Sequence, residues 1–158
     1  MEAIQNGLIE KLIVFTVAEY HLALPIAEVL QVVNKPTITD ELTKTGLVQI
    51  GRHMIRLLDL HQQLAANSVQ VPKTRPFLVI TRMQGEICAI PVSEPPNLIE
   101  LPLGMMQLLP QSHSGLLRIA SHAAAVTQDE LTATLFLLDI KRILAPSPAL
   151  SPNEEQYY

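Results

Sequence analysis

Residues 23–28 read ALPIAE and residues 89–94 read AIPVSE, so a short apolar motif centred on proline recurs after 66 residues, from 23 to 89. Upstream, IVFT at residues 13–16 matches LVIT at residues 78–81, a shift of 65 from 13 to 78. Both segments predict a strand pair. Because the shift changes from 65 in the first strand to 66 in the second, one hairpin turn is predicted to be a residue longer than the other.

A second repeated motif extends the duplication toward the carboxyl end. IRLLDL at residues 55–60 matches LFLLDI at residues 135–140, a shift of 80 from 55 to 135, and a short helix-like stretch follows each. Two matches in the same order indicate an internal duplication. We therefore predict one domain over residues 11–145, built from two similar β-subdomains at about 11–75 and 76–145. Each is too small to be stable alone, so they should share one hydrophobic seam.

The rest of the chain favours an all-β fold. Short runs of Ile, Val, Leu and Phe lie between turn-forming residues, which is typical of buried strands. The predicted strands are 12–17, 21–25, 29–33, 47–50, 54–59, 77–81, 86–90, 98–102, 116–121 and 132–139. Only residues 60–64 and 140–144 are predicted as short helices, each after an aspartate suited to capping. Residues 1–10 are interpreted as an extension, and the proline-rich residues 146–158 as a disordered tail.

Composition excludes several classes of protein. The chain has 158 residues, and its 11 Lys and Arg against 15 Asp and Glu give a formal charge of −4 without any basic stripe. Nucleic acid and direct membrane insertion are therefore not expected. The single cysteine, Cys88, lies in an apolar run and excludes a disulfide framework or a multi-cysteine zinc site. Since no secretory signal is present at the amino terminus, we expect a cytoplasmic protein.

Chemistry-bearing residues give little support for catalysis. Asp59 and Asp139 occupy equivalent places in the two halves, as the carboxylates of an aspartic protease do, but no Thr/Ser-Gly follows either one. Capping of a helix is the stronger interpretation. The five histidines have no metal-binding spacing, and no phosphate-binding glycine motif is present, so neither a metal nor a cofactor is expected. Besides a duplicated enzyme that uses these aspartates, a barrel binding small apolar ligands is an alternative, although it requires a hollow core.

Two further groups leave a choice open. Arg52, His53 and Arg56 lie around one predicted strand, where arginine beside apolar positions is typical of an interface but also of a solvated face. Met105 and Met106 are compatible with an adaptable binding surface or with filling of the core.

The order of the motifs resembles the CheW-like domain. That family typically reads L-V-V-F, then A-L-P-I-x-x-V-x-E-V, then I-I-P-V-I-D-L. Here LIVF at residues 12–15, ALPIAEVLQVV at 23–33 and IRLLDL at 55–60 correspond, and the second half fits from 77 to 140. The resemblance covers about residues 12–144, and it rests on the order of motifs that are individually apolar and unspecific.

The resemblance implies two intertwined SH3-like five-stranded barrels and a non-catalytic adaptor. Such proteins join a CheA-like histidine kinase to methyl-accepting receptors. The family's binding surfaces would involve seven residues here: Val29, Gln31, Val32, Ile38, Gly51, Arg52 and Ile55.

This chain departs from the family pattern in three places. The family's Arg-Gly turn is Gly51-Arg52 here, and the family's glutamate is Gln31, so the usual ion pair between these two positions is not available. The loop after Ile38 is about four residues shorter than usual. These changes suggest a pilus-based or phototactic pathway rather than flagellar chemotaxis.

Overall fold

The computed structural model describes residues 8–34, 46–64, 75–83, 85–128 and 130–144. Of the expected amino-terminal extension, only residues 8–10 are described, and Ile9 and Glu10 already belong to the first strand. The predicted tail at 146–158 and the candidate residue Ile38 lie outside the described residues. None of the helices within these ranges is long and apolar enough to span a membrane.

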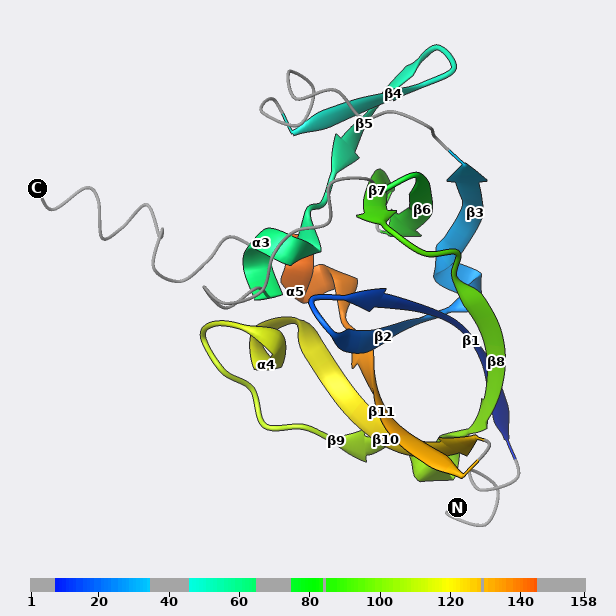
Figure 1. Ribbon diagram of the computed structural model, residues 1–158. Helices are drawn as coiled ribbons and strands as arrows, with labels where there is room; N and C mark the ends of the chain where they lie inside the picture. The colour runs from blue at the N-terminus through cyan, green and yellow to red at the C-terminus, as the bar shows by residue number, and fades with distance from the viewer. Residues whose placement is uncertain (1–7, 35–45, 65–74, 84, 129, 145–158) are drawn as a thin grey trace, which may run out of the picture.

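Strands make up most of the described chain (Figure 1). The strands are β1 (Ile9–Val17), β2 (Tyr20–Pro25), β3 (Val29–Asn34), β4 (Leu47–Ile50), β5 (His53–Leu57), β6 (Phe77–Met83), β7 (Glu86–Val92), β8 (Asn97–Pro102), β9 (Gln107–Leu108), β10 (Ala120–Gln128) and β11 (Leu131–Leu138). The helices are η1 (Ile26–Glu28), α3 (Leu60–Leu64), η2 (Leu103–Met105), α4 (Leu116–Ile119) and α5 (Ile140–Leu144). The all-β fold class is confirmed.

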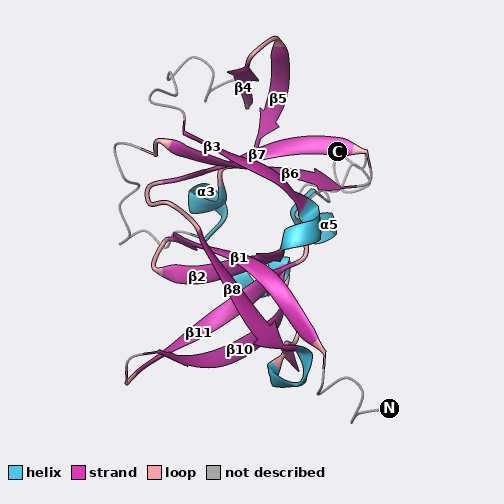
Figure 2. Cartoon of the chain, turned by 90° about the vertical axis from the view of Figure 1, so that its right-hand side faces the viewer, coloured by secondary structure: helices cyan, strands magenta, loops and turns pink. Residues whose placement is uncertain are grey.

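Two sheets are formed, and each takes strands from both halves of the chain. One sheet has the order β8-β1-β2-β11-β10-β9, and the other has the order β3-β6-β7-β5-β4. The helices α3 and α5 lie between the two sheets (Figure 2). Because the hairpin β1–β2 joins strands of the second half, and β6–β7 joins strands of the first, the two barrels are intertwined.

The strand register confirms the internal duplication. Leu57 of β5 pairs in parallel with Ala89 of β7, and Leu137 of β11 pairs in parallel with Ala23 of β2. The same shifts of 80 (57 to 137) and 66 (23 to 89) relate these two pairs to each other. The fold therefore has an approximate internal two-fold symmetry.

The expected difference between the hairpin turns is wrong. Val17 pairs with Tyr20 and Met83 pairs with Glu86, so both turns contain two residues and both strands of the hairpin shift by 66. The error arose because consecutive apolar residues can be matched one position out of place. In the structure, the turn fixes the register.

Three apolar clusters form the core. The largest lies between the sheets and takes residues from both hairpins and from the three α-helices, including Phe15, Leu22, Ile90 and Ile119. The second fills the five-stranded sheet's barrel around Val48, and the third fills the six-stranded sheet's barrel. We call the first cluster the shared core. It corresponds to the hydrophobic seam that the duplication predicts.

Both predicted helices are confirmed with their bounds, but the predicted strand at 116–121 is wrong. Residues Leu116–Ile119 form α4, and the strand β10 starts only at Ala120 and continues to Gln128, beyond the end of the predicted strand. Three consecutive alanines, 123–125, have low strand propensity and hide β10 in the sequence. The two-residue strand β9 was also missed.

Candidate functional site

The first part of the candidate site lies on β3. Gln31 and Val32 are exposed, whereas Val29 is half-buried and packs against the shared core. A register shift between Val29 and Gln31 leaves Leu30 outside the regular pairing, and its side chain is also exposed. Among the described strands, β3 pairs only with β6, so it forms one edge of the five-stranded sheet. The result is a polar residue flanked by exposed apolar side chains.

The second part of the candidate site is the turn between β4 and β5. Gly51 has a φ of 59°, and glycine at the first central position is what a type II′ hairpin turn requires. Arg52 follows it and is exposed, and its guanidinium has no polar partner in the described part of the chain. Arg56 differs, because its Nη1 donates to Oε1 of Glu86 at 3.0 Å. Arg52 is therefore available to a partner's carboxylate.

The structure does not bring all these residues together. β3 and β4 are the two opposite edges of the five-stranded sheet, so the residues of β3 and the Gly51–Arg52 turn form two separate groups. Ile55 is half-buried and packs, with Val33 and Ile50, against the core of the five-stranded barrel. Its side chain thus links the two groups from the inside rather than contributing an exposed contact.

Exposed apolar residues beside both groups were missed by the sequence analysis. Leu30 on β3, and Leu47 and Met54 on the β4–β5 hairpin, are exposed large hydrophobic residues that the sequence did not single out, whereas Val32, which is also exposed, was among the candidates. Alternation along β4 and β5 would have identified Leu47 and Met54, since Val48 and Ile55 face inward. No simple pattern identifies Leu30, because its exposure follows from the irregular register.

The internal symmetry relates the β3 group to a second surface. Val32 of β3 pairs with Val79, and Leu98 of β8 pairs with Ile13. The shift of 66 relates these two pairs, from 32 to 98 and from 13 to 79. Gln31 and Val32 therefore correspond to Asn97 and Leu98. Asn97 and Leu98 line an open recess of about 620 Å³ at the mouth of the six-stranded barrel. Leu131, which is 76% exposed, also lines this recess. Both barrels therefore present a related end to solvent.

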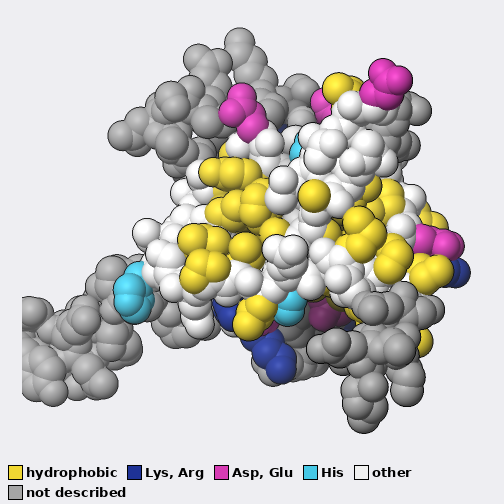
Figure 3. Space-filling view, turned by 90° about the horizontal axis from the view of Figure 1, so that it is seen from below, with side chains coloured by type: hydrophobic (Ala, Val, Ile, Leu, Met, Phe, Trp, Pro, Cys, Tyr) yellow, Lys and Arg dark blue, Asp and Glu magenta, His cyan; other side chains and the backbone are white. Residues whose placement is uncertain are grey.

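Apolar side chains cover much of the face seen in Figure 3, the side of the molecule on which β9, β10 and β11 lie. Leu108 is exposed on β9, and Met105 of η2, three residues earlier, is also exposed. Met106 instead packs against the core of the six-stranded barrel. The exposed Met105 is thus compatible with a binding surface, and Met106 fills the core, so each methionine fits one of the two roles that the sequence left open. Exposed apolar area of this kind is typical of surfaces that bind proteins.

Asp59 and Asp139 cap helices, as expected. The backbone N–H of His61 donates to Oδ1 of Asp59 at 3.1 Å, and the N–H of Lys141 donates to Oδ1 of Asp139 at 3.0 Å. Each carboxylate also has its own arginine: Arg75 lies 2.9 Å from Asp59, and Arg142 lies 3.5 Å from Asp139. The carboxylates of Asp59 and Asp139 do not contact each other. They therefore cannot share a proton, as the hypothesis of a two-aspartate enzyme requires.

For the alternative of an apolar-ligand barrel, the described residues of the six-stranded barrel leave little internal space. Inside the six-stranded barrel, a cavity of about 10 Å³ lies among Leu12, Leu101, Ala124 and Leu137. A volume of this size holds at most one water molecule. Among the described residues, no cluster of three or more His, Cys, Asp or Glu could hold a metal ion.

His61 is the buried histidine of α3, and it makes folding sensitive to acid. Burial lowers its pKa below the ordinary 6.5, the nearby Arg75 lowers it further, and Asp59 acts in the opposite direction. Its Nδ1 has no hydrogen-bond partner within the described residues. The unfolded chain therefore binds a proton more readily than the folded chain, and stability should fall as the pH drops below about 6.5.

We predict that His61→Gln reduces this loss of stability between pH 7 and pH 5.5, because the titrating group is gone. The measurement is the urea-unfolding free energy at several pH values. His113→Gln, which removes an exposed histidine, is the control and should keep the wild-type pH dependence. An unchanged pH dependence in His61→Gln would show that another group is responsible.

Comparison with known proteins identifies the family. The family model for the CheW-like domain matches residues 11–147, and the chain therefore belongs to the CheW-like domain family. Among solved structures, the scaffolding protein TtCheW from Thermoanaerobacter tengcongensis is similar, with a TM-score of 0.68 and 16% sequence identity. The match covers 89% of this chain and 90% of that chain, and it supports the fold. No curated protein matches the sequence.

Proposed function

We propose that this chain is a non-catalytic cytoplasmic adaptor that couples a CheA-like histidine kinase to methyl-accepting receptors. The pathway would be a chemotaxis, phototaxis or pilus-motility system. The observation that carries the proposal is the CheW-like family match over residues 11–147. The proposed functional unit is the single domain of residues 11–145, with its halves meeting near residue 75.

The arrangement of surfaces supports an adaptor. An adaptor must bind two partners at the same time, and the internal symmetry provides related surfaces on two different barrels. One includes Gln31 and Val32 of β3, and the other is the recess beside Leu98 and Leu131; the Gly51–Arg52 turn forms a separate group on the first barrel. Exposed apolar residues beside an arginine that has no polar partner among the described residues are typical of protein interfaces. Coupling of this kind requires only that the contacts differ between receptor states.

The role of Arg52 tests the site within this proposal. We expect Arg52→Ala to weaken binding of the kinase or the receptor by about fivefold or more, roughly 1 kcal/mol, because an exposed arginine with no polar partner among the described residues can pair with a partner's carboxylate. Thermal unfolding should stay unchanged. Binding is measured by calorimetric titration with the kinase regulatory domain and with a receptor cytoplasmic fragment.

Arg56→Ala is the matched control for this experiment. Arg56 lies on the neighbouring strand, and its guanidinium already pairs with Glu86, so its loss should leave both affinities close to wild type. Unchanged affinity of Arg52→Ala for both partners would remove Arg52 from the site without touching the family assignment.

A further inference from the structure

The short helix α4 lies where the two halves of the duplication meet. Its Ile119 belongs to the shared core, together with Leu60 of α3 and Ile140 of α5. α3 follows β5 of the five-stranded sheet, whereas α5 follows β11 of the six-stranded sheet. The relative placement of α3 and α5 therefore reflects the relative placement of the two barrels.

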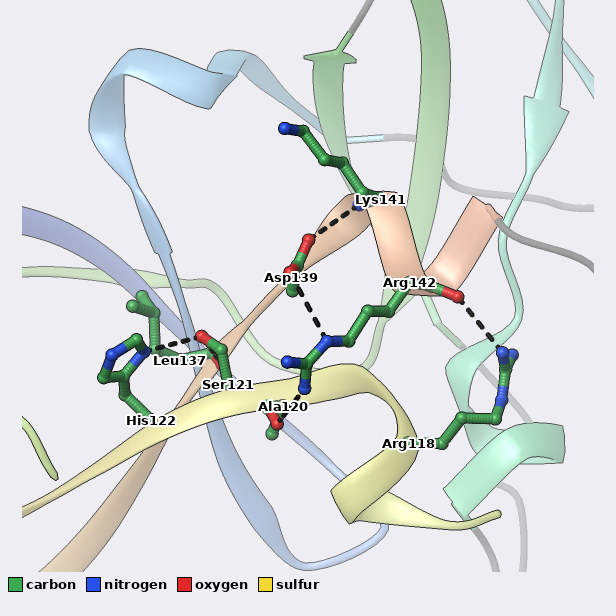
Figure 4. A network of polar contacts seen from close by, with 8 residues as sticks. All are labelled: Arg118, Ala120, Ser121, His122, Leu137, Asp139, Lys141 and Arg142. Carbon is green, nitrogen blue, oxygen red and sulfur yellow. Dashed lines mark hydrogen bonds and ion pairs between the residues drawn. The ribbon is translucent and has the colours of Figure 1, made fainter. Parts of the chain in front are cut away.

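Arg118 of α4 connects these two helices through one planar group. Its Nη1 donates to the backbone carbonyl of Arg142 in α5 at 3.1 Å, and its Nη2 donates to Oε1 of Gln63 in α3 at 3.1 Å. Figure 4 shows Arg118 reaching toward the carbonyl of Arg142. A guanidinium with donors in a fixed fork sets the direction of both contacts at once.

The α5 end of this connection is itself held in place. The Nη1 of Arg142 donates to the carbonyl of Ala120 at 3.0 Å, and its Nε lies 3.5 Å from Oδ2 of Asp139 (Figure 4). Apolar packing in the shared core is non-directional, so by itself it allows small rotations of one helix against another. The polar chain from Gln63 through Arg118 and Arg142 to Ala120 is directional, and it restricts such rotations.

From these contacts we infer that Arg118 is a positioning residue, which fixes the two barrels in the relative orientation that lets the adaptor engage both partners productively. This inference rests on the proposed function. Arg118 would not contact either partner itself. Its loss should therefore affect the transmission between the partners more than the affinity for each one alone.

The first test is hydrogen exchange of the backbone amides in the full-length chain. Arg118→Ala should speed exchange about tenfold in peptides covering both α3 and α5, because both helices lose a charge-assisted hydrogen bond. Gln63→Ala removes only the contact with α3, so the faster exchange should be confined to Leu60–Leu64. Arg56→Ala removes an exposed arginine on β5 and should change neither helix. Wild-type exchange in Arg118→Ala would overturn the inference.

The second test separates positioning from general folding. With kinase and receptor fragments, Arg118→Ala should lower receptor-dependent stimulation of kinase autophosphorylation severalfold at saturating adaptor. Its affinity for the isolated kinase regulatory domain should stay within twofold of wild type. Arg118→Lys keeps the charge but lacks the fork, so it should not restore stimulation. A parallel loss of affinity and stimulation, or full rescue by lysine, would contradict the positioning role.

These tests distinguish the inference from the proposed function. If the wild-type chain gives no receptor-dependent stimulation, the proposed function fails. The exchange measurement then still decides whether Arg118 joins α3 to α5.

Discussion

Leu58→Ala and Leu138→Ala should each lower the free energy of unfolding by about 2–5 kcal/mol, and by similar amounts. The two leucines occupy equivalent positions in the duplicated motif, and they are 4% and 3% exposed in the shared core. Removing either side chain leaves a cavity between the same two sheets. Urea denaturation, with the m-value checked for each variant, measures the effect.

Leu131→Ala is the control for this pair, since that leucine is 76% exposed and its truncation should cost little. A nearly neutral result for one of the core variants would contradict the equivalence of the two halves. It would mean that the second half packs around its leucine differently from the first.

Asp59→Ala should cost more stability than Asp139→Ala, although both residues cap a helix. The Asp59–Arg75 pair is at 2.9 Å, and both side chains are only 13% exposed, so the variant leaves a largely buried guanidinium without its carboxylate. We expect a loss of about 3 kcal/mol. The Asp139–Arg142 pair is longer and more exposed, and Arg142 keeps its bond to Ala120. That variant should lose about 1 kcal/mol, mainly the cap.

Asp59→Asn separates the two contributions of Asp59. Asparagine still accepts the hydrogen bond from the N–H of His61 but no longer neutralises Arg75. Asp59→Asn should therefore remain closer to Asp59→Ala than to wild type. Equal costs for Asp59→Ala and Asp139→Ala would show that the ion pair with Arg75 adds nothing beyond the cap.

Much of the fold could be predicted from the sequence because the repeated motifs contain buried strand ends followed by a capping aspartate. The α3 and α5 bounds, and the equivalence of Leu58 and Leu138, follow directly from these motifs. The hairpin register could not be predicted, since a run such as LVIT aligns equally well one residue out of place. The strand β10 was hidden because its three alanines pack well only in their tertiary setting.

The candidate site was harder to predict than the fold. The resemblance pointed to Gly51, Arg52 and the residues of β3, but sequence order could not show that they lie on opposite edges of one sheet. Ile55 faces inward, which strand alternation allows but does not decide without a register. No motif could predict the recess at the other barrel, because its lining combines β1 and β2 with β8, β10 and β11, which follow much later in the sequence.

Co-sedimentation shows whether this chain joins a CheA-like kinase to receptors. Membranes that carry a methyl-accepting receptor from the same genome are mixed with the cognate kinase and pelleted, with or without this chain. We expect the kinase to enter the pellet together with the receptor only when the chain is present, in a dose-dependent manner. Kinase recovery that is independent of the chain, or a chain that pellets with neither partner, would contradict it.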